Sequence, residues 1–430
     1  MITISAEYLD DNWKILISNS ILRITLSEWD EGDAYVLSSM GQFHSLKKID
    51  AVIVIGDTKV SGIPIVIRLY KVPNDSKTYS YVSPEGTLYT ANAYRAIADN
   101  KNQPLTIVIA NIANTLSLRR EGILESELLQ DSVVTIIGLG TGGIQIALEL
   151  AKSGVSKFHL IDPDRLDVGN TCRHQAGISS VGRKKVFVGR DLILEKNPKA
   201  TITTYPICAC EEEKEKLTSI IRFSDLVICA TDSRQSKLFV NSICVETKKP
   251  IIFGGAFRRA YGGSILRVHP DETACYHCFV LAMPEEEADQ EISSEKNANE
   301  IAYSDMPVKI EPGLSIDVAP IGIMVSKIAL QELIKLKPST LHILDKDFEA
   351  NWYLWINRPE PKTKYATLPP LSESYDEMTI LRWYAIFLRK DPNCPTCGDF
   401  TKALSEKYGF DLKTIKPLTT LPDLPKDIFK

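Results

Sequence analysis

Three glycines mark the first stretch of this sequence that can do chemistry. Gly138, Gly140 and Gly143 form the pattern G-x-G-x-x-G, after a run of apolar residues and before a helix-like stretch. Glycines at this spacing let the backbone turn tightly and bring a phosphate to the N-terminus of the helix. Asp162 follows about 20 residues later, where a carboxylate that holds a ribose is expected. The stretch predicts a nucleotide site, although a tight strand-to-helix turn alone gives the same glycine pattern.

The residues after Asp162 indicate which kind of nucleotide binds. Asn170, Arg173 and Gln175 follow closely, and Lys185 begins the next helix-like stretch. Two cations and two amides near a phosphate-binding turn are suited to clamping a triphosphate and stabilising charge on a leaving pyrophosphate. Hydride transfer builds no such charge, so an NAD-dependent oxidoreductase is the weakest interpretation. The alternative is a solvated polar loop.

A further carboxylate, Asp232, follows the apolar run LVICAT. Ligands of open α/β sheets gather at the carboxyl ends of the strands, and Mg²⁺ prefers one or two carboxylates together with phosphate oxygens. Asp232 is therefore a candidate magnesium ligand. The alternative is that it only caps the following helix.

The nine cysteines include two C-x-x-C pairs. Four thiolates in two such pairs suit a tetrahedral zinc ion, and neither pair has the thioredoxin-like context that a redox dithiol would need. The predicted zinc ligands are Cys275, Cys278, Cys394 and Cys397. We interpret Cys208, Cys210, Cys229 and Cys244 as core residues, because they lie in apolar strand-like or helix-like runs.

The elements that position these residues alternate between strand and helix. We expect strands over 133–138, 157–162, 202–209 and 225–232, helices over 144–154 and 182–196, two strands around a turn over 251–270, and a helix over 319–337. This order is typical of a Rossmann-like, doubly wound α/β domain. Residues 284–312 are polar and acidic, which indicates a long crossing loop.

The flanking segments carry fewer signals. Residues 1–115 contain several Ile- and Val-rich runs and one helix-like stretch at 91–100, which predicts a small α+β domain. Residues 341–359 favour strands and 378–389 favour a helix. We divide the chain into an accessory domain (1–115), a nucleotide-binding domain (116–345, crossing loop about 279–312) and a C-terminal segment (346–430) that carries the second cysteine pair.

Composition excludes several classes of protein. The chain has 430 residues and a formal net charge of -5, with scattered basic residues, so we expect no nucleic-acid or membrane partner. No apolar stretch approaches the ~18 residues of a membrane span, and the N-terminus lacks the pattern of a signal peptide. The expected compartment is the cytoplasm.

Taken in order, GLGTGG, LIDPDRLDVGNTCRHQ, VGRKKV, ICATDS, CYHC and CPTC resemble the ThiF/MoeB superfamily of ubiquitin-activating-enzyme-like adenylyltransferases. The resemblance implies an ATP turn at the three glycines, and a large mixed sheet. It also implies ribose binding by Asp162 with Asp164, phosphate contacts from Asn170, Arg173, Gln175 and Lys185, Mg²⁺ at Asp232, and structural zinc. Family members use an arginine that reaches into the partner subunit, so Arg119 or Arg120 and a homodimer are implied.

The sequence departs from this family in its crossing loop. Many relatives pass the acyl group to a cysteine there, but no cysteine lies between Cys278 and Cys394, and Lys309 stands about where several relatives keep theirs. Three alternatives remain open. The reaction stops at the adenylate; or Cys172 attacks it; or a loop hydroxyl makes an oxyester, for which the candidates are Ser293, Ser294, Ser304 and Ser315.

The resemblance implies ATP- and Mg²⁺-dependent adenylation of the C-terminal carboxylate of a ubiquitin-like protein, which is then passed to a conjugating partner, as in a bacterial ubiquitin-like pathway. Two rivals are a microcin-type peptide adenylyltransferase and a non-catalytic scaffold subunit. The scaffold is disfavoured because Arg173, Lys185 and Asp232 are all present.

Overall fold

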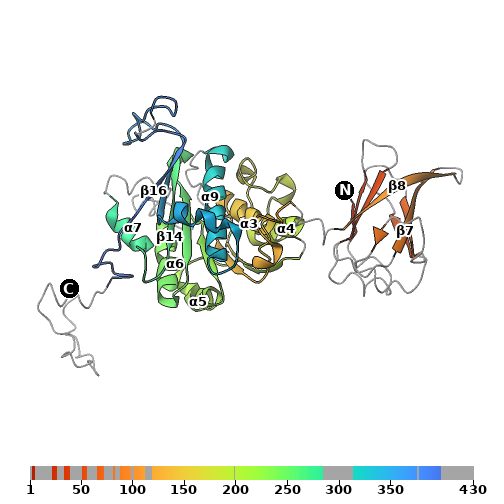
Figure 1. Ribbon diagram of the computed structural model, residues 1–430, viewed down its shortest axis with the longest axis horizontal. Coiled ribbons are helices and arrows are strands. Elements are labelled where there is room, and N and C mark those ends of the chain that lie inside the picture. Colours follow the sequence, from red (N-terminus) through yellow and green to blue (C-terminus); the bar gives the residue numbers. More distant parts are fainter. Residues whose placement is uncertain are drawn as a thin grey trace, which may run out of the picture. The chain divides into compact units, whose positions relative to one another are not determined.

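The computed structural model describes residues 119–283 and 313–398, apart from residues 198, 375 and 376, together with eight strands before residue 112. The chain divides into two compact units, Met1–Ser126 and Glu127–Lys430, which we describe separately (Figure 1). The predicted boundary at residue 115 stays a prediction. Among the described residues, no helix is both long and apolar enough to span a bilayer.

The first unit contains one sheet of eight strands. In sequence order these are β1 (Ile2–Ile4), β2 (Leu22–Leu26), β3 (Asp33–Ser38), β4 (Ala51–Ile55), β5 (Ile65–Lys71), β6 (Tyr81–Val82), β7 (Leu88–Ile97) and β8 (Lys101–Asn111). The order in the sheet is β1-β2-β3-β8-β7-β5-β4, with β6 beside β7. The pairs are antiparallel except for β3 with β8.

The predicted helix over 91–100 is wrong, because most of these residues lie in β7. The alanines in this stretch are strong helix formers, but propensity is a small preference per residue, and β7 pairs with β5 on one side and β8 on the other. Tertiary pairing therefore overrides the local propensity. The described residues account for the β part of the predicted α+β domain.

The second unit is built on a mixed sheet in the order β11-β10-β9-β12-β13-β14-β15-β16. Its strands are β9 (Val133–Ile137), β10 (Lys157–Ile161), β11 (Thr201–Tyr205), β12 (Leu226–Cys229), β13 (Ile251–Ala256), β14 (Gly262–Val268), β15 (Trp352–Ile356) and β16 (Arg382–Ile386). The pairs from β11 to β13 are parallel, and those from β13 to β16 are antiparallel. The predicted α/β class and large mixed sheet are confirmed.

Helices cover both faces of this sheet (Figure 1). The helices are α3 (Thr141–Lys152), α4 (Lys185–Lys196), α5 (Lys214–Arg222), α6 (Arg234–Thr247), α7 (Tyr276–Ala282) and α9 (Ser315–Ile334). Helix α3 packs between α4 and α9, whereas α6 packs between α5 and α7. Because helices cover both faces, nearly all of β9 and β12 is buried. Strands buried on both faces are mostly apolar, which explains the Ile- and Val-rich sequence of these two.

Two predictions for the C-terminal part need correction. Residues 378–389 do not form a helix; β16 lies there and pairs with β15, where the rings of Trp355 and Trp383 are 5.4 Å apart. Residues Arg382–Ile386 include Trp, Tyr and Ile, which suit a strand once β15 offers an edge. Of residues 341–359, only Trp352–Ile356 form a strand, because a 3₁₀ helix (η8, Thr340–Phe348) precedes it.

Candidate functional site

A cavity of about 360 Å³ lies at the carboxyl ends of β9, β10 and β12. Strand ends of an open parallel sheet meet at one edge, so the side chains that follow them converge there. Eight of the predicted site residues line this cavity: Gly138, Gly140, Asp162, Asp164, Asn170, Arg173, Lys185 and Asp232.

The glycine turn requires glycine at two of its three positions. Gly138 has φ +88°, and a Cβ there would lie 2.8 Å from the carbonyl oxygen of Ala230. A Cβ on Gly143 would lie 1.8 Å from the carbonyl oxygen of Gly138. Gly143 therefore lets α3 approach β9 but does not line the cavity. Gly140 is the N-cap of α3, so the N-terminus of that helix faces the cavity.

Asp162 is buried and holds the turn in place. Its carboxylate accepts hydrogen bonds from the backbone N–H of Leu139 at 2.6 Å and of Asp164 at 2.8 Å. Burial raises the pKa of Asp162, and this outweighs the opposing effects of the Lys185 charge and the two N–H donors. A carboxylate fixed in this way is oriented before any ligand arrives.

Lys185 is the first residue of α4, and its ammonium group lies 2.9 Å from the carboxylate of Asp164. Burial disfavours its charged form, but the carboxylates of Asp162, Asp164 and Asp232 outweigh burial and raise its pKa. The Lys185 side chain is 12% exposed and that of Asp164 is 62% exposed. The cation is therefore fixed at the wall, whereas its partner is free to turn toward solvent.

The segment after β10 is only partly as predicted. Asp167 and Asn170 form a capping box, in which the Asn170 side chain accepts a hydrogen bond from the backbone N–H of Asp167. Asn170 and Arg173 line the cavity. Gln175 does not: it is exposed, and its amide donates to the side chain of Gln145 at 2.6 Å. The structure therefore does not bring Gln175 to the predicted phosphate clamp.

Asp232 does not act as the cap of the following helix. The N-cap of α6 is Ser233, whose hydroxyl accepts a hydrogen bond from the backbone N–H of Ser236. Asp232 is exposed at the cavity wall and contributes to the raised pKa of Lys185. A carboxylate next to a cationic clamp fits a Mg²⁺ ion that bridges phosphate oxygens.

His174 is a site residue that the sequence gave no role. Its Nδ1 accepts a hydrogen bond from the backbone N–H of Ala176, so Nε2 carries the proton and donates to the carbonyl oxygen of Leu139 at 3.1 Å. Burial lowers the pKa of His174, and the Lys185 charge acts in the same direction. A neutral imidazole thus braces the glycine turn. The local sequence did not indicate this role, because the partner of the imidazole is a backbone carbonyl 35 residues away.

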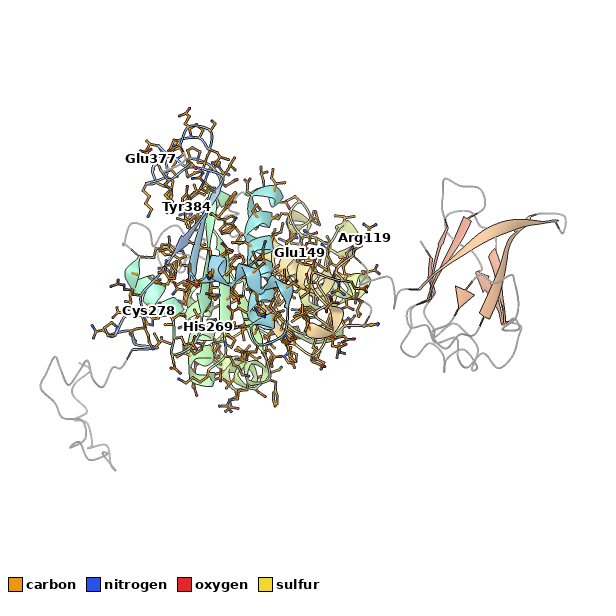
Figure 2. The ribbon with its side chains drawn as sticks, in the orientation of Figure 1. Arg119, Glu149, His269, Cys278, Glu377 and Tyr384 are labelled. Carbon is orange, nitrogen blue, oxygen red and sulfur yellow. A yellow bond between two sulfur atoms is a disulfide. The ribbon has the colours of Figure 1, made fainter. Side chains whose placement is uncertain are left out.

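Of the remaining candidates, those that the structure describes do not line the cavity. Arg119 is exposed and Arg120 is partly buried, in a turn that belongs to the first unit; burial lowers the pKa of Arg120 (Arg119 is labelled in Figure 2). Cys172 is exposed, and its thiol donates to the carbonyl oxygen of Gly169. Ser315 begins α9. Ser293, Ser294, Ser304 and Lys309 lie outside the described residues.

The four cysteines of the C-x-x-C pairs come together near α7, and Figure 2 shows Cys278 far from Glu149 of α3. The Sγ–Sγ distances are 3.9 Å for Cys275–Cys278, 3.6 Å for Cys275–Cys394 and 3.4 Å for Cys278–Cys397. Thiolates at tetrahedral Zn–S distances lie about 3.8 Å apart, so the group has the size of a zinc site. Three of the four cysteines are buried, as expected for a structural metal.

Neighbouring groups support this cluster. The backbone N–H of Asp391 donates to the sulfur of Cys278 at 3.4 Å, and His277 and Thr396 share a hydrogen bond of 2.9 Å that joins the two pairs. Hydrogen bonds with the thiols of Cys278 and Cys397 lower the pKa of Cys275 to about 3. The donor set therefore fits zinc.

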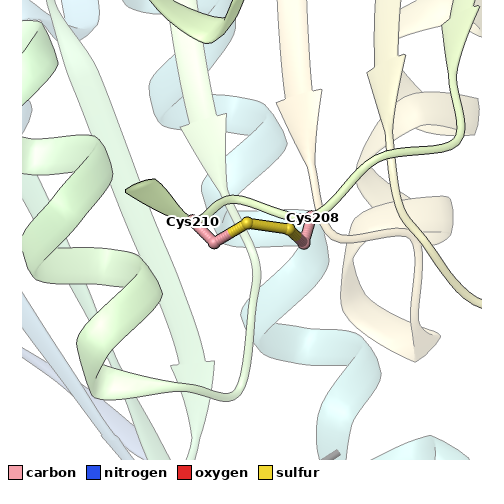
Figure 3. The surroundings of a disulfide bond; sticks show 2 residues. All are labelled: Cys208 and Cys210. Carbon is pink, nitrogen blue, oxygen red and sulfur yellow. A yellow bond between two sulfur atoms is a disulfide. The ribbon is translucent and has the colours of Figure 1, made fainter. Parts of the chain in front are cut away.

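The interpretation of Cys208 and Cys210 as core residues is wrong. They form a disulfide on the loop after β11, and both are only partly buried (Figure 3). Local apolarity misled the prediction, because β11 ends at Tyr205 and the chain then leaves the sheet. Cys229 and Cys244 are buried as expected.

The fold and the cavity define a nucleotide-binding α/β domain. Residues 113–378 match the ThiF family, and the chain belongs to that family. The predicted superfamily is therefore confirmed, and with it the prediction of an adenylyltransferase, since relatives from this family include proteins named for that activity.

Three relatives show how far the likeness extends. The sulfur carrier protein adenylyltransferase of Thermus thermophilus is 24% identical over 281 residues, which cover 64% of this chain and 84% of that protein. The molybdopterin-synthase adenylyltransferase of Escherichia coli is 33% identical over 154 residues, 36% of this chain and 60% of that one. The ubiquitin-like modifier-activating enzyme 5 of Caenorhabditis elegans is 27% identical over 172 residues, 38% and 41% of the two chains.

Among solved structures, the chain is similar to E. coli MccB with ATP, at 17% identity and a TM-score of 0.45, over 63% of this chain and 68% of that one.

Proposed function

We propose that this protein is an ATP- and Mg²⁺-dependent adenylyltransferase that activates the C-terminal carboxylate of a ubiquitin-like or sulfur-carrier-type protein. The observation that carries the proposal is the set of charged side chains around one glycine turn: Arg173 and Lys185 beside Asp162 and Asp232, on a single cavity. The names of the curated relatives support the same substrate class.

Each group has a task that follows from its chemistry. The N-terminus of α3 and the turn at Gly138 bind phosphate, and Asp162 binds the ribose. Asp232 would hold Mg²⁺, which would supply positive charge for the phosphates. Arg173 and Lys185 neutralise the charge that grows on the leaving pyrophosphate as the carboxylate attacks the α-phosphorus. His174 positions Leu139 through the hydrogen bond to its carbonyl oxygen.

The acyl adenylate then passes to a conjugating partner or a small nucleophile. The crossing loop has no cysteine to form a thioester, and Cys172 does not line the cavity. We therefore favour direct transfer from the adenylate, with an oxyester on a loop serine as the alternative route.

Further parts of the proposal rest on the family. We propose a homodimer in which Arg119 or Arg120 completes the partner's site, and a structural zinc ion at the four-cysteine cluster. We further propose that residues 1–115 and 346–430 recognise protein partners. The protein would then act in the cytoplasm, in a bacterial ubiquitin-like pathway.

ATP–pyrophosphate exchange in the presence of candidate ubiquitin-like proteins tests the reaction. We expect exchange that requires both a free C-terminal carboxylate and Mg²⁺, and that disappears in Asp232→Ala. Exchange that survives this substitution would remove the magnesium assignment. No exchange with any acceptor would favour the scaffold.

Mass spectrometry of the product identifies the acyl substrate. An adenylated ubiquitin-like protein supports the proposal, whereas an adenylated short peptide would favour the microcin-type reaction. An adduct on the enzyme that withstands thiol reductant but yields to alkali would indicate an oxyester. An adduct released by reductant would point to Cys172.

A further inference from the structure

One disulfide lies at the wall of the nucleotide cavity. Cys208 and Cys210 are joined on the loop that follows β11, with Cα atoms 5.5 Å apart (Figure 3). Cys208 lines the cavity together with its neighbours Ile207 and Ala209. The bridge therefore belongs to the same wall as the phosphate-binding turn and Asp232.

We propose that this pair is a reversible oxidation site that sets the affinity of the cavity for MgATP, with the oxidised form binding more tightly. The inference rests on the proposed function only in taking MgATP as the ligand. Neither the family match nor the names of the relatives assigns a role to these cysteines.

The physical reason is the position of the bridge. Residues 206–210 form neither helix nor strand, and the loop is anchored by Ile207 and Ala209, which pack against the core. The disulfide ties Cys208 on the wall to Cys210, the N-cap of the 3₁₀ turn Glu211–Glu213 that leads into α5. Reduction replaces the bond by a contact between two thiols, so the sulfur atoms separate and the wall gains conformations. A wall that is ordered beforehand loses less entropy when the ligand binds.

The redox step balances by thiol–disulfide exchange with a low-molecular-weight disulfide. One cysteine thiolate attacks that disulfide and forms a mixed disulfide, releasing one thiol; the second cysteine then displaces the other thiol and closes the bridge. A dithiol reductant reverses both steps. Both cysteines are partly exposed and accessible to such reagents, whereas Cys229 and Cys244 are buried.

The test is a titration of the full-length protein with MgATP by calorimetry, after treatment with oxidised glutathione or with a phosphine reductant. The peptide 200–214, released by trypsin, contains both cysteines, and its mass is lower by two hydrogen atoms when they are bridged. We expect the oxidised form to bind MgATP about three- to tenfold more tightly, the range for ordering one side chain or a short loop.

Variants separate this pair from the other thiols. Cys208→Ser combined with Cys210→Ser should bind MgATP like the reduced protein and ignore the redox treatment, whereas Cys172→Ser should keep the full response. Zinc content is measured in every sample, because reduced Cys208 and Cys210 also form a possible three-ligand group with Glu212.

Several results would overturn the inference. These are equal affinity in both redox states, a response that survives in the double variant, a peptide that never bridges, or a change in affinity that follows extra bound zinc. Binding of MgATP that ignores the redox state removes this inference alone. Absence of MgATP binding in both states removes the proposed function as well.

Discussion

The nucleotide cavity and the four-cysteine cluster use polar groups in opposite ways. At the cavity, Asp164 and Asp232 are exposed beside Lys185, which is itself nearly buried. At the cluster, Cys275, Cys278 and Cys394 are buried and turned toward one another. The cavity is lined by residues that come directly after neighbouring strands. The cluster instead joins two segments that are 119 residues apart in the sequence. The polar groups of the cavity are thus open to solvent, whereas the sulfur atoms of the cluster face one another in the interior.

The largest effect is expected from breaking the cluster. Cys394→Ser removes a buried sulfur that joins the C-terminal segment to α7. Because the variant should no longer hold the structural metal, we expect its free energy of unfolding to fall by more than about 4 kcal/mol. Denaturant unfolding and zinc content measure this. Cys172→Ser, an exposed cysteine outside the cluster, should keep both stability and zinc. A stable Cys394→Ser protein without zinc would show that the cluster does not hold the fold.

The next effect concerns the cavity alone. Arg173→Ala should lower the rate of ATP–pyrophosphate exchange by about 10²- to 10³-fold, the usual loss when one group that stabilises developing charge is removed. Unfolding should change little. Arg183→Ala removes an exposed arginine that pairs with Asp191 outside the cavity, and should leave exchange near the wild-type rate. Equal losses in the two variants would contradict the assignment.

A smaller effect is expected from the glycine turn. Gly138→Ala introduces both a positive φ and a contact of 2.8 Å with the Ala230 backbone, at a cost of about 1–3 kcal/mol in unfolding free energy. Gly182 has φ +84° but nothing within 4 Å of its added Cβ, so Gly182→Ala isolates the backbone strain. Gly138→Ala should be the less stable of the two and should bind MgATP more weakly; equal stabilities would remove the close approach as the cause.

The smallest effect is a pH dependence. Burial lowers the pKa of His174 below its ordinary value of 6.5, so the unfolded chain binds more protons as the solution becomes acidic. The contribution of His174 to the free energy of unfolding is therefore fully present above pH 6.5 and is lost as the pH falls. Unfolding between about pH 7.5 and 5.5 should become less pH-dependent in His174→Gln.

His342 provides a control of opposite sign. A hydrogen bond to the carbonyl of Lys337 raises the pKa of His342, so its contribution is present in acid and is lost as pH rises. His342→Gln should make the loss of stability in acid larger. If both variants changed the slope in the same direction, His174 would not be the group that titrates.

The sequence alone determined the nucleotide turn and the two cysteine pairs. Gly138, Gly140 and Asp162 belong to one strand–turn–helix–strand unit, whose geometry follows from local backbone rules, so their common cavity was predictable. The pairing of Cys275 and Cys278 with Cys394 and Cys397 followed from ligand number, because zinc takes four.

Features that depend on partners far away in the sequence could not be predicted from local patterns. Residues 91–97 and 382–386 are strands because neighbouring strands offer hydrogen bonds there, which local propensity does not record. Gln175 turns to Gln145, and His174 braces Leu139, because a loop and a helix meet in space. The bridge between Cys208 and Cys210 lies at the cavity wall because β11 ends at Tyr205 and the chain then forms a loop there. Local sequence specifies the glycine turn, whereas the side chains that surround it in the cavity depend on long-range packing.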